Sequence, residues 1–183
     1  MADKKLVSAG KPKIGGAIYR APIGTALPTD TESPLNEAFK NLGYCGEDGL
    51  SNSFSGESEA EKAWGGDDVL NAKKTNTDKF KFKLLESLNE EVLKTVFTDA
   101  NVTGTLSTGV TVKVNGAEQE PKAWVVEMIM NKAIKRIVIP SASVTEVGEI
   151  VYKDGQSVGY EITLSASKDE QGNSHYEYIK ETV

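Results

Sequence analysis

The side chains that could do chemistry are few in this sequence. His175 is the single histidine and Cys45 the single cysteine. A Ser-His-Asp arrangement would have to be built on His175, which has no nucleophile-elbow sequence near it. One histidine and one cysteine cannot supply the ligands of a zinc site, and a lone cysteine forms no intrachain disulfide. The sequence therefore predicts no enzyme, no metal site and no cofactor.

The charged and glycine-rich motifs point no further toward catalysis. Asp67-Asp68 lacks the ligand spacing of a calcium loop, and Gly15-Gly16 is too short for a dinucleotide fingerprint. Lysines alternate at positions 79, 81 and 83, and this row is the one basic feature that could contact nucleic acid. Alternating lysines also keep an exposed strand soluble and prevent unwanted pairing, which is the interpretation we favour.

Length and charge limit the class of protein. The 183 residues suffice for one folded domain, and we expect residues 1–183 to form it. A net charge of −6 argues against a protein that grips phosphates through clustered basic residues, but not against one that touches DNA without holding it. Because the sequence shows no secretory leader pattern and no long apolar run, we expect a chain made and kept in the cytoplasm, without membrane insertion.

The elements needed to position any site begin with irregular sequence. Glycine and proline punctuate the start, and we expect residues 1–28 to form an extended N-terminal arm. A short helix is predicted next, from Ser33-Pro34 to Gly43, because serine caps helices, proline suits their first position and glycine ends them. Its apolar face would consist of Leu35, Phe39 and Leu42.

Residues 44–67 are expected to form a long glycine-rich loop, because glycines alternate there with serine, asparagine and acidic residues. Residues 50–54 could form a strand at its base. Phe54 and Trp64 are large apolar groups with little local sequence to bury them. Such groups in a long loop suggest a partner surface, although packing back on the parent domain would also bury them.

The sequence after residue 78 has the periodicity of strands and one helix. Phe80, Phe82 and Leu84 alternate with lysines, which predicts a half-buried strand. A second helix should follow, capped by Ser87 or Asn89, and lie on the sheet. Its apolar face would consist of Leu88, Val92, Leu93, Val96 and Phe97.

Strands dominate the remaining chain. They are predicted at residues 110–114, 124–130, 135–139, 147–152, 158–164 and 175–179, with hairpin turns at Asn115-Gly116, 153–156 and 170–173. The fold class that follows is α+β and mainly β. We predict an antiparallel β-sandwich or small barrel with one or two short flanking helices.

Short segments spread along the chain carry a more specific signal. In order they are KPKIGGAIYRAP at 11–22, GTALPTD at 24–30, LGY at 42–44, EDGL at 47–50, KAWGGD at 62–67, KRIVIP at 135–140, VTEVG at 144–148 and YEITL at 160–164. Together they resemble the major tail proteins, or tail tube proteins, of siphophages that infect Gram-positive bacteria. The resemblance covers nearly the whole chain in the same order.

The resemblance implies a phage tail tube-like fold, a β-sandwich flanked by a helix, whose hexameric rings stack into a β-lined channel. The implied partners are further copies of the chain, the tape measure protein, the tail terminator and the distal tail protein. Double-stranded DNA would pass through the lumen without specific binding. The protein would then reside in a virion tail, assembled in the host cytoplasm. The alternatives are a tube subunit of a domesticated phage-tail-like particle and a soluble β-barrel binding domain.

In the family the rings are bridged by the N-terminal arm, the long loop and often the C-terminal segment. The order of the motifs maps these here to residues 4–28, to residues 44–67 and to the chain after His175. The candidate residues of the subunit and ring interface are Ile14, Tyr19, Phe54 and Trp64.

A channel for DNA should be acidic or neutral, because a basic lining would hold the duplex. Glu127 and Glu161 are the acidic residues flanked by strand sequence, and they are the candidate lumen-facing residues. Glu161 alternates with Tyr160 and Ile162, so it should face the side of the sheet opposite to them.

Overall fold

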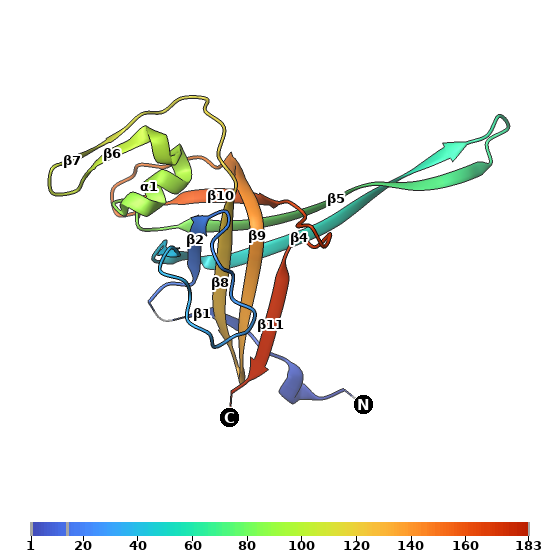
Figure 1. The fold of residues 1–183 in the computed structure, drawn as a ribbon, viewed down its shortest axis with the longest axis horizontal. Helices are drawn as coiled ribbons and strands as arrows, with labels where there is room; N and C mark the ends of the chain where they lie inside the picture. Colours follow the sequence, from blue (N-terminus) through green and yellow to red (C-terminus); the bar gives the residue numbers. More distant parts are fainter. Residues whose placement is uncertain (1, 14, 183) are drawn as a thin grey trace.

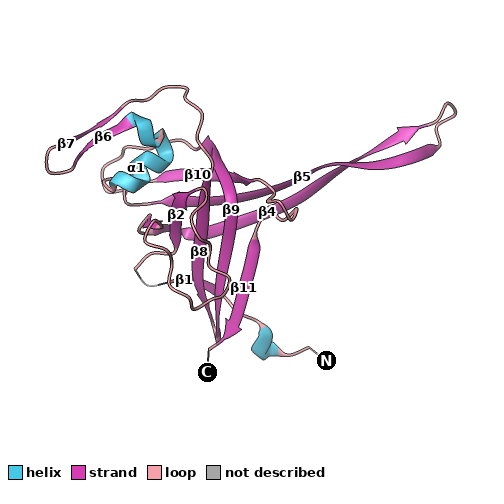
Figure 2. Cartoon of the chain, in the orientation of Figure 1, coloured by secondary structure: helices cyan, strands magenta, loops and turns pink. Residues whose placement is uncertain are grey.

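An open antiparallel sheet organises the chain (Figures 1 and 2). The computed structural model describes residues 2–13 and 15–182, and within them nine strands belong to this sheet. Their order is β3-β2-β8-β9-β10-β5-β4, with β1 paired to β8 and β11 paired to β9. The bounds are β1 (Gly10–Pro12), β2 (Ile18–Pro22), β3 (Lys40–Asn41), β4 (Cys45–Lys62), β5 (Asp68–Leu84), β8 (Lys122–Met130), β9 (Ala133–Val147), β10 (Tyr160–Ala166) and β11 (Tyr176–Glu181).

The other described elements are short. They are one α-helix, α1 (Glu90–Phe97), the 3-10 helices η1 (Lys4–Leu6) and η2 (Asp99–Asn101), and a separate hairpin of β6 (Val102–Thr105) and β7 (Gly109–Val112). The predicted mainly β, antiparallel fold with a short flanking helix is confirmed. The sheet is open and does not close into a barrel.

The predicted long loop at residues 44–67 is wrong, because most of it is strand β4. This 18-residue strand pairs with the 17-residue β5, from Leu50 opposite Phe82 to Lys62 opposite Asp68. Figure 1 shows the resulting hairpin projecting far beyond the rest of the chain. A two-stranded ribbon in solvent buries no face, so its sequence needs no apolar alternation, and interstrand hydrogen bonds alone satisfy its backbone.

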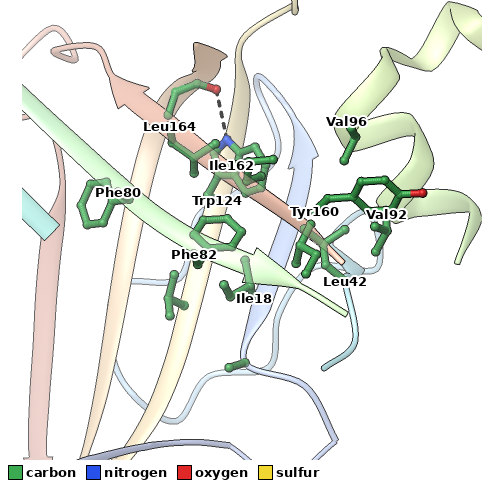
Figure 3. Close-up of a cluster of buried hydrophobic side chains, with 14 of the residues drawn as sticks. Ile18, Leu42, Phe80, Phe82, Val92, Val96, Trp124, Tyr160, Ile162 and Leu164 are labelled. Atoms are coloured by element: carbon green, nitrogen blue, oxygen red, sulfur yellow. Dashed lines mark hydrogen bonds between the residues drawn. The ribbon is translucent and has the colours of Figure 1, made fainter. Parts of the chain in front are cut away.

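Two apolar clusters cover the opposite faces of the β2-β8-β9 region. Trp124 and Val126 of β8 belong to the larger cluster, and Ala123 and Val125 to the smaller one. This explains why residues 123–127 are buried without alternation. Figure 3 shows the larger cluster, in which Trp124 donates its indole N–H to the carbonyl of Ala142 at 3.0 Å. Full burial of each large side chain contributes about 1.5–3 kcal/mol relative to exposure.

Helix α1 confirms the predicted second helix and its cap. The Asn89 side chain accepts a hydrogen bond from the backbone N–H of Glu91 at 3.0 Å, as an N-cap residue does. Val92, Leu93 and Val96 are buried against the sheet as predicted. Leu88 precedes the helix and is 68% exposed, so it does not belong to the apolar face.

The helix predicted from Ser33-Pro34 to Gly43 does not form. The Asp30 carboxylate accepts the backbone N–H of Glu32 and of Ser33, and such local side-chain bonds offer the backbone an alternative to a helix. Leu42 and Phe39 are buried as apolar residues should be, but they join different clusters on opposite faces of the sheet. A helix would present both to one face.

Strand β9 differs from prediction because it continues through Pro140 to Val147. Its pairing with β11 ends at Val138, and its pairing with β10 begins at Ala142. On its other edge, the register with β8 shifts between Trp124 and Lys122. Pro140 therefore lies between the paired stretches of β9. At this point neither edge of the strand needs a hydrogen bond from a backbone N–H, which proline lacks.

One predicted turn, one predicted strand and the extent of the N-terminal arm are also corrected. The hairpin turn lies at residues 106–108 between β6 and β7 and not at Asn115-Gly116, which follows the end of β7 at Val112. Residues 148–152 form no strand, so β10 pairs with β9 and β5 after a long connection. The arm predicted over residues 1–28 is also too long, because β2 lies between β3 and β8 with Ile18 and Ala21 buried.

Candidate assembly surfaces

The tip of the β4–β5 hairpin presents the most exposed large apolar side chain among the described residues. Trp64 is 107% exposed and lies in the turn between the two strands. Phe54, on β4 nearer the body, is 63% exposed. Both candidate interface residues are therefore accessible to another molecule. A tryptophan with no packing in its own chain is the kind of group that anchors a protein interface.

The base of this hairpin is held by a buried carboxylate. Asp78 of β5 is 2% exposed and accepts hydrogen bonds from the Asn52 side chain at 2.7 Å and the Ser174 hydroxyl at 2.6 Å. His175 Nδ1 contacts the same carboxylate, and the His175 ring meets Phe80 edge-on at 5.2 Å. Asp78 thereby joins both hairpin strands to the segment before β11.

This arrangement gives His175 a structural role. Ser174 and His175 both contact Asp78 instead of each other, so the three side chains do not form the relay of a catalytic triad. The sequence assigned His175 no structural role and gave no indication of Asp78. The alternating strand pattern from Phe80 onward starts two residues after Asp78, and that offered no signal for a buried acid.

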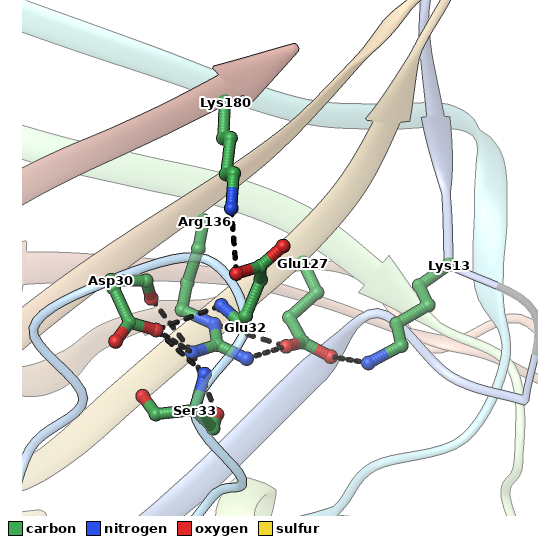
Figure 4. Close-up of polar contacts among 7 residues, drawn as sticks. All are labelled: Lys13, Asp30, Glu32, Ser33, Glu127, Arg136 and Lys180. Atoms are coloured by element: carbon green, nitrogen blue, oxygen red, sulfur yellow. Dashed lines mark hydrogen bonds and ion pairs between the residues drawn. The ribbon is translucent and has the colours of Figure 1, made fainter. Parts of the chain in front are cut away.

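Glu127 does not face a channel in this structure. It is 2% exposed, and its carboxylate accepts from Arg136 Nε at 3.0 Å and from Lys13 Nζ at 2.6 Å (Figure 4). Arg136 also donates to the carbonyls of Asp30 and Ser33, at 2.7 and 3.0 Å. The prediction that Glu127 lines a lumen is therefore wrong. Its carboxylate instead fixes the 30–33 segment and the end of the N-terminal segment to the sheet.

A sequence signal for this pair exists. Glu127 is a charge inside the apolar run of β8, Arg136 of β9 precedes an apolar run, and the two lie directly opposite each other across the β8–β9 hairpin. Glu127 and Arg136 are equally far along the chain from the tight turn at Asn131-Lys132, and this symmetry would have predicted their pairing. A lone charge in a strand with both faces covered must be paired, because an unpaired buried charge is too costly.

Glu161 lies on a polar face of the sheet. It is half-exposed and forms an ion pair with Lys81 at 2.8 Å, while Tyr160 and Ile162 are buried on the other side. The predicted orientation of Glu161 is confirmed. The hydrogen bond and charge of Glu161 raise the pKa of Lys81.

The remaining candidates are less accessible. Tyr19 of β2 is half-buried against the smaller cluster, and burial, followed by the Glu127 charge, raises its pKa. Ile14 lies outside the described residues. Cys45 is a half-buried free thiol whose pKa is raised to about 11, first by burial and then by Glu86. Among the side chains that the structure describes, no group of three or more His, Cys, Asp or Glu is placed to hold a metal ion.

The family described as phage tail tube protein matches residues 2–183. The chain belongs to the phage tail tube protein family. This confirms the resemblance at the level of the family and the virion tail as the place of the protein. The narrower resemblance to siphophages of Gram-positive bacteria stays a prediction.

Solved structures similar to this phage tail tube protein include two chains of gene transfer agent particles. One, from the virion of a native particle, is 10% identical with a TM-score of 0.43, covering 80% of this chain and 92% of that chain. The other, from the tail of an empty particle with C6 symmetry, has the same identity and TM-score and covers 91% and 95%. Similarity at this level does not establish which residues of the chains correspond. No curated protein matched the sequence.

Among the described residues, no helix is long and apolar enough to cross a bilayer. The exposed hairpin tip and the polar face around Glu161 are the accessible candidate surfaces of this phage tail tube protein.

Proposed function

We propose that this protein is the repeating subunit of a non-contractile phage tail tube. Copies assemble into hexameric rings, and the rings stack into a channel for DNA. The role is structural and not enzymatic. The observation that carries the proposal is the long β4–β5 hairpin with a fully exposed Trp64 at its tip, in a member of the tail tube family.

The hairpin supports assembly because its own chain does little to stabilise it. Beyond the Asp78 anchor, β4 has β5 as its paired strand, and its outer edge has no partner among the described residues. An isolated two-stranded hairpin is marginally stable in water. Contact with another copy would bury its tip, and head-to-tail contacts between identical subunits close into rings or continue into filaments.

The polar face of β5 and β10 suits the channel wall. Lys79, Lys81 and Lys83 lie on it, and Glu161 neutralises the central lysine. A face with paired charges attracts phosphates less than an unopposed basic row does, because affinity grows with the number of released counterions. DNA would therefore slide past without being held. The tape measure protein, tail terminator and distal tail protein are the further partners we propose.

Electron microscopy tests the proposal directly. Concentrated purified protein, with or without a distal tail protein as seed, should show tubes or stacked rings in negative stain. Rotational averaging of end views should give six-fold symmetry. Dispersed monomers under both conditions, or a stable complex with a small molecule, would contradict the tube function.

A further inference from the structure

A concave basic surface lies between the end of β2, the start of β8 and helix α1. The cavity has a volume of about 460 Å³. We call it the basic groove, and the charged side chains that line it are Arg20, Lys40, Glu91, Lys94, Asp99 and Lys122. Four cations face two carboxylates there, so positive charge is in excess.

The ion pairs inside the basic groove leave this excess in place. Arg20 bridges Glu91 at 3.1 Å and Asp99 at 2.7 Å. Lys94 contacts Glu91 at 2.8 Å and Lys122 contacts Asp99 at 2.7 Å, so each carboxylate is shared by two cations. Lys122 also lies 3.5 Å from an exposed glutamate outside the cavity lining.

Both carboxylates are ionised at neutral pH. Burial would raise the pKa of Glu91 and of Asp99, but hydrogen bonds and charges from the surrounding cations outweigh it and lower both. They can therefore offset two of the four cations. Arg20 is 6% exposed, and its Nε is buried without a hydrogen-bond partner among the described residues. The groove can accept further negative charge.

A segment with an excess of acidic residues lies at the other end of the molecule. Residues 57–75, the tip half of the hairpin, contain five carboxylates and three lysines. Glu57, Glu59 and Glu61 occupy alternate positions of β4. Lys73 lies opposite Ser58 across the hairpin, and Lys74 follows it in β5. With five carboxylates and three lysines, the tip half carries a net charge of −2.

The two surfaces cannot meet within one subunit. Figure 1 places the hairpin tip at one end of the longest axis and helix α1, which borders the basic groove, near the other. Complementary surfaces at opposite ends of a molecule form heterologous, head-to-tail contacts between copies. Electrostatic complementarity of this kind sets orientation and suppresses wrong pairings.

We propose that the basic groove receives the acidic tip half of the β4–β5 hairpin of a second copy. The inference rests on the proposed function and adds the acceptor surface to it. Lys40 is the cation most available to the incoming carboxylates. Its side chain is exposed, and its ammonium donates to an uncharged backbone carbonyl, that of Glu37, at 3.2 Å.

The row at Lys79, Lys81 and Lys83 is the competing basic surface. It lies on the open face of the sheet and not in a cavity, and Lys81 is already paired with Glu161. It therefore supplies the matched control. Lys79→Glu with Lys83→Glu changes the net charge by the same amount as Lys40→Glu with Lys94→Glu, at a surface that the inference leaves outside the contact.

Charge reversal and its rescue form the test, with tube formation by the full-length chain measured by sedimentation and negative stain. The groove variant Lys40→Glu/Lys94→Glu should need about tenfold more protein than the wild type to form tubes, or more. The hairpin variant Glu57→Lys/Glu59→Lys/Glu61→Lys should be impaired similarly. Combining both sets should restore assembly toward the wild-type level. The control variant should assemble like the wild type.

Other outcomes separate the two proposals. If the wild type forms tubes and the groove variant assembles equally well, the inference is wrong and the tube function is unaffected. If Lys79→Glu with Lys83→Glu rescues the hairpin variant, the contact lies at the competing surface and the inference is wrong. Failure of the wild type to assemble would overturn both. If circular dichroism shows that the double groove variant misfolds, Lys40→Glu alone carries the test.

Discussion

The two tryptophans of this protein lie in regions held together by different forces. Trp124 is 1% exposed within the larger apolar cluster of the body, and its indole N–H donates to the carbonyl of Ala142. Trp64 is fully exposed at the end of a hairpin that has one strand pair and no core. The body is stable because it buries apolar surface within the chain. Under the proposed function, the hairpin tip is buried by another copy of the chain.

The largest effect is expected from a substitution at Trp124. Trp124→Ala should lower the free energy of unfolding by about 3–5 kcal/mol, because it leaves a cavity in the larger cluster and an unpaired carbonyl. Urea denaturation followed by circular dichroism measures this. Since small domains are stable by only about 5–15 kcal/mol, the variant should be marginal at best. A loss below about 1 kcal/mol would show that the cluster does not hold the body.

A buried ion pair gives the next largest effect. Glu127→Ala should cost about 3 kcal/mol, because Arg136 would be left buried without its carboxylate. Glu127→Leu combined with Arg136→Met should recover most of that loss, since apolar side chains of similar size need no partner there. The free energies of unfolding of the single and double variants decide this. If the double variant is no more stable than the single one, the pair is not the reason for the loss.

The same substitution at the other tryptophan should separate folding from assembly. Trp64→Ala should change the free energy of unfolding of the monomer by less than about 0.5 kcal/mol. It should weaken tube formation by about 2 kcal/mol or more, as truncation of an interface anchor does. Monomer melting and tube sedimentation measure the two effects. A destabilised monomer that still assembles normally would mean that Trp64 packs on its own chain.

A smaller effect should distinguish the two regions chemically. Burial holds the pKa of Cys45 at about 11, so little reactive thiolate forms at pH 8 and alkylation should quicken as the pH rises toward 11. In a Cys45→Ser background, Ala63→Cys places a thiol beside Trp64, where a pKa of about 8.5 is expected. Its alkylation at pH 8 should be faster by on the order of 100-fold. Equal rates would mean that the Cys45 environment is open.

The same contrast explains what the sequence could predict. Phe80, Phe82 and Leu84 alternate because one face of β5 is buried there, and the helix cap at Asn89 acts through local hydrogen bonds. Both features are local, and both were predicted. The outer hairpin has no buried face and therefore no periodic signal, so its polar sequence suggested a loop.

The roles of the buried polar residues depended on contacts distant in sequence. Asp78 meets Ser174 and His175 almost a hundred positions away, and no local pattern indicates that contact. Glu127 was placed on the wrong surface because its strand is covered on both faces, which a single strand sequence does not reveal. The predicted roles of Phe54, Trp64 and Glu161 in a tube remain predictions about neighbouring copies.

Hydrogen exchange of the free subunit and of the assembled tube tests the central claim most directly. Backbone amides at residues 80–84 and 123–126 should be protected in both states, because the body holds them. Amides at residues 57–68 should exchange rapidly in the free subunit and become protected in the tube. Rapid exchange of the hairpin tip in both states would contradict its role as the link between copies, and protection in both would show that the hairpin is stable without a neighbour.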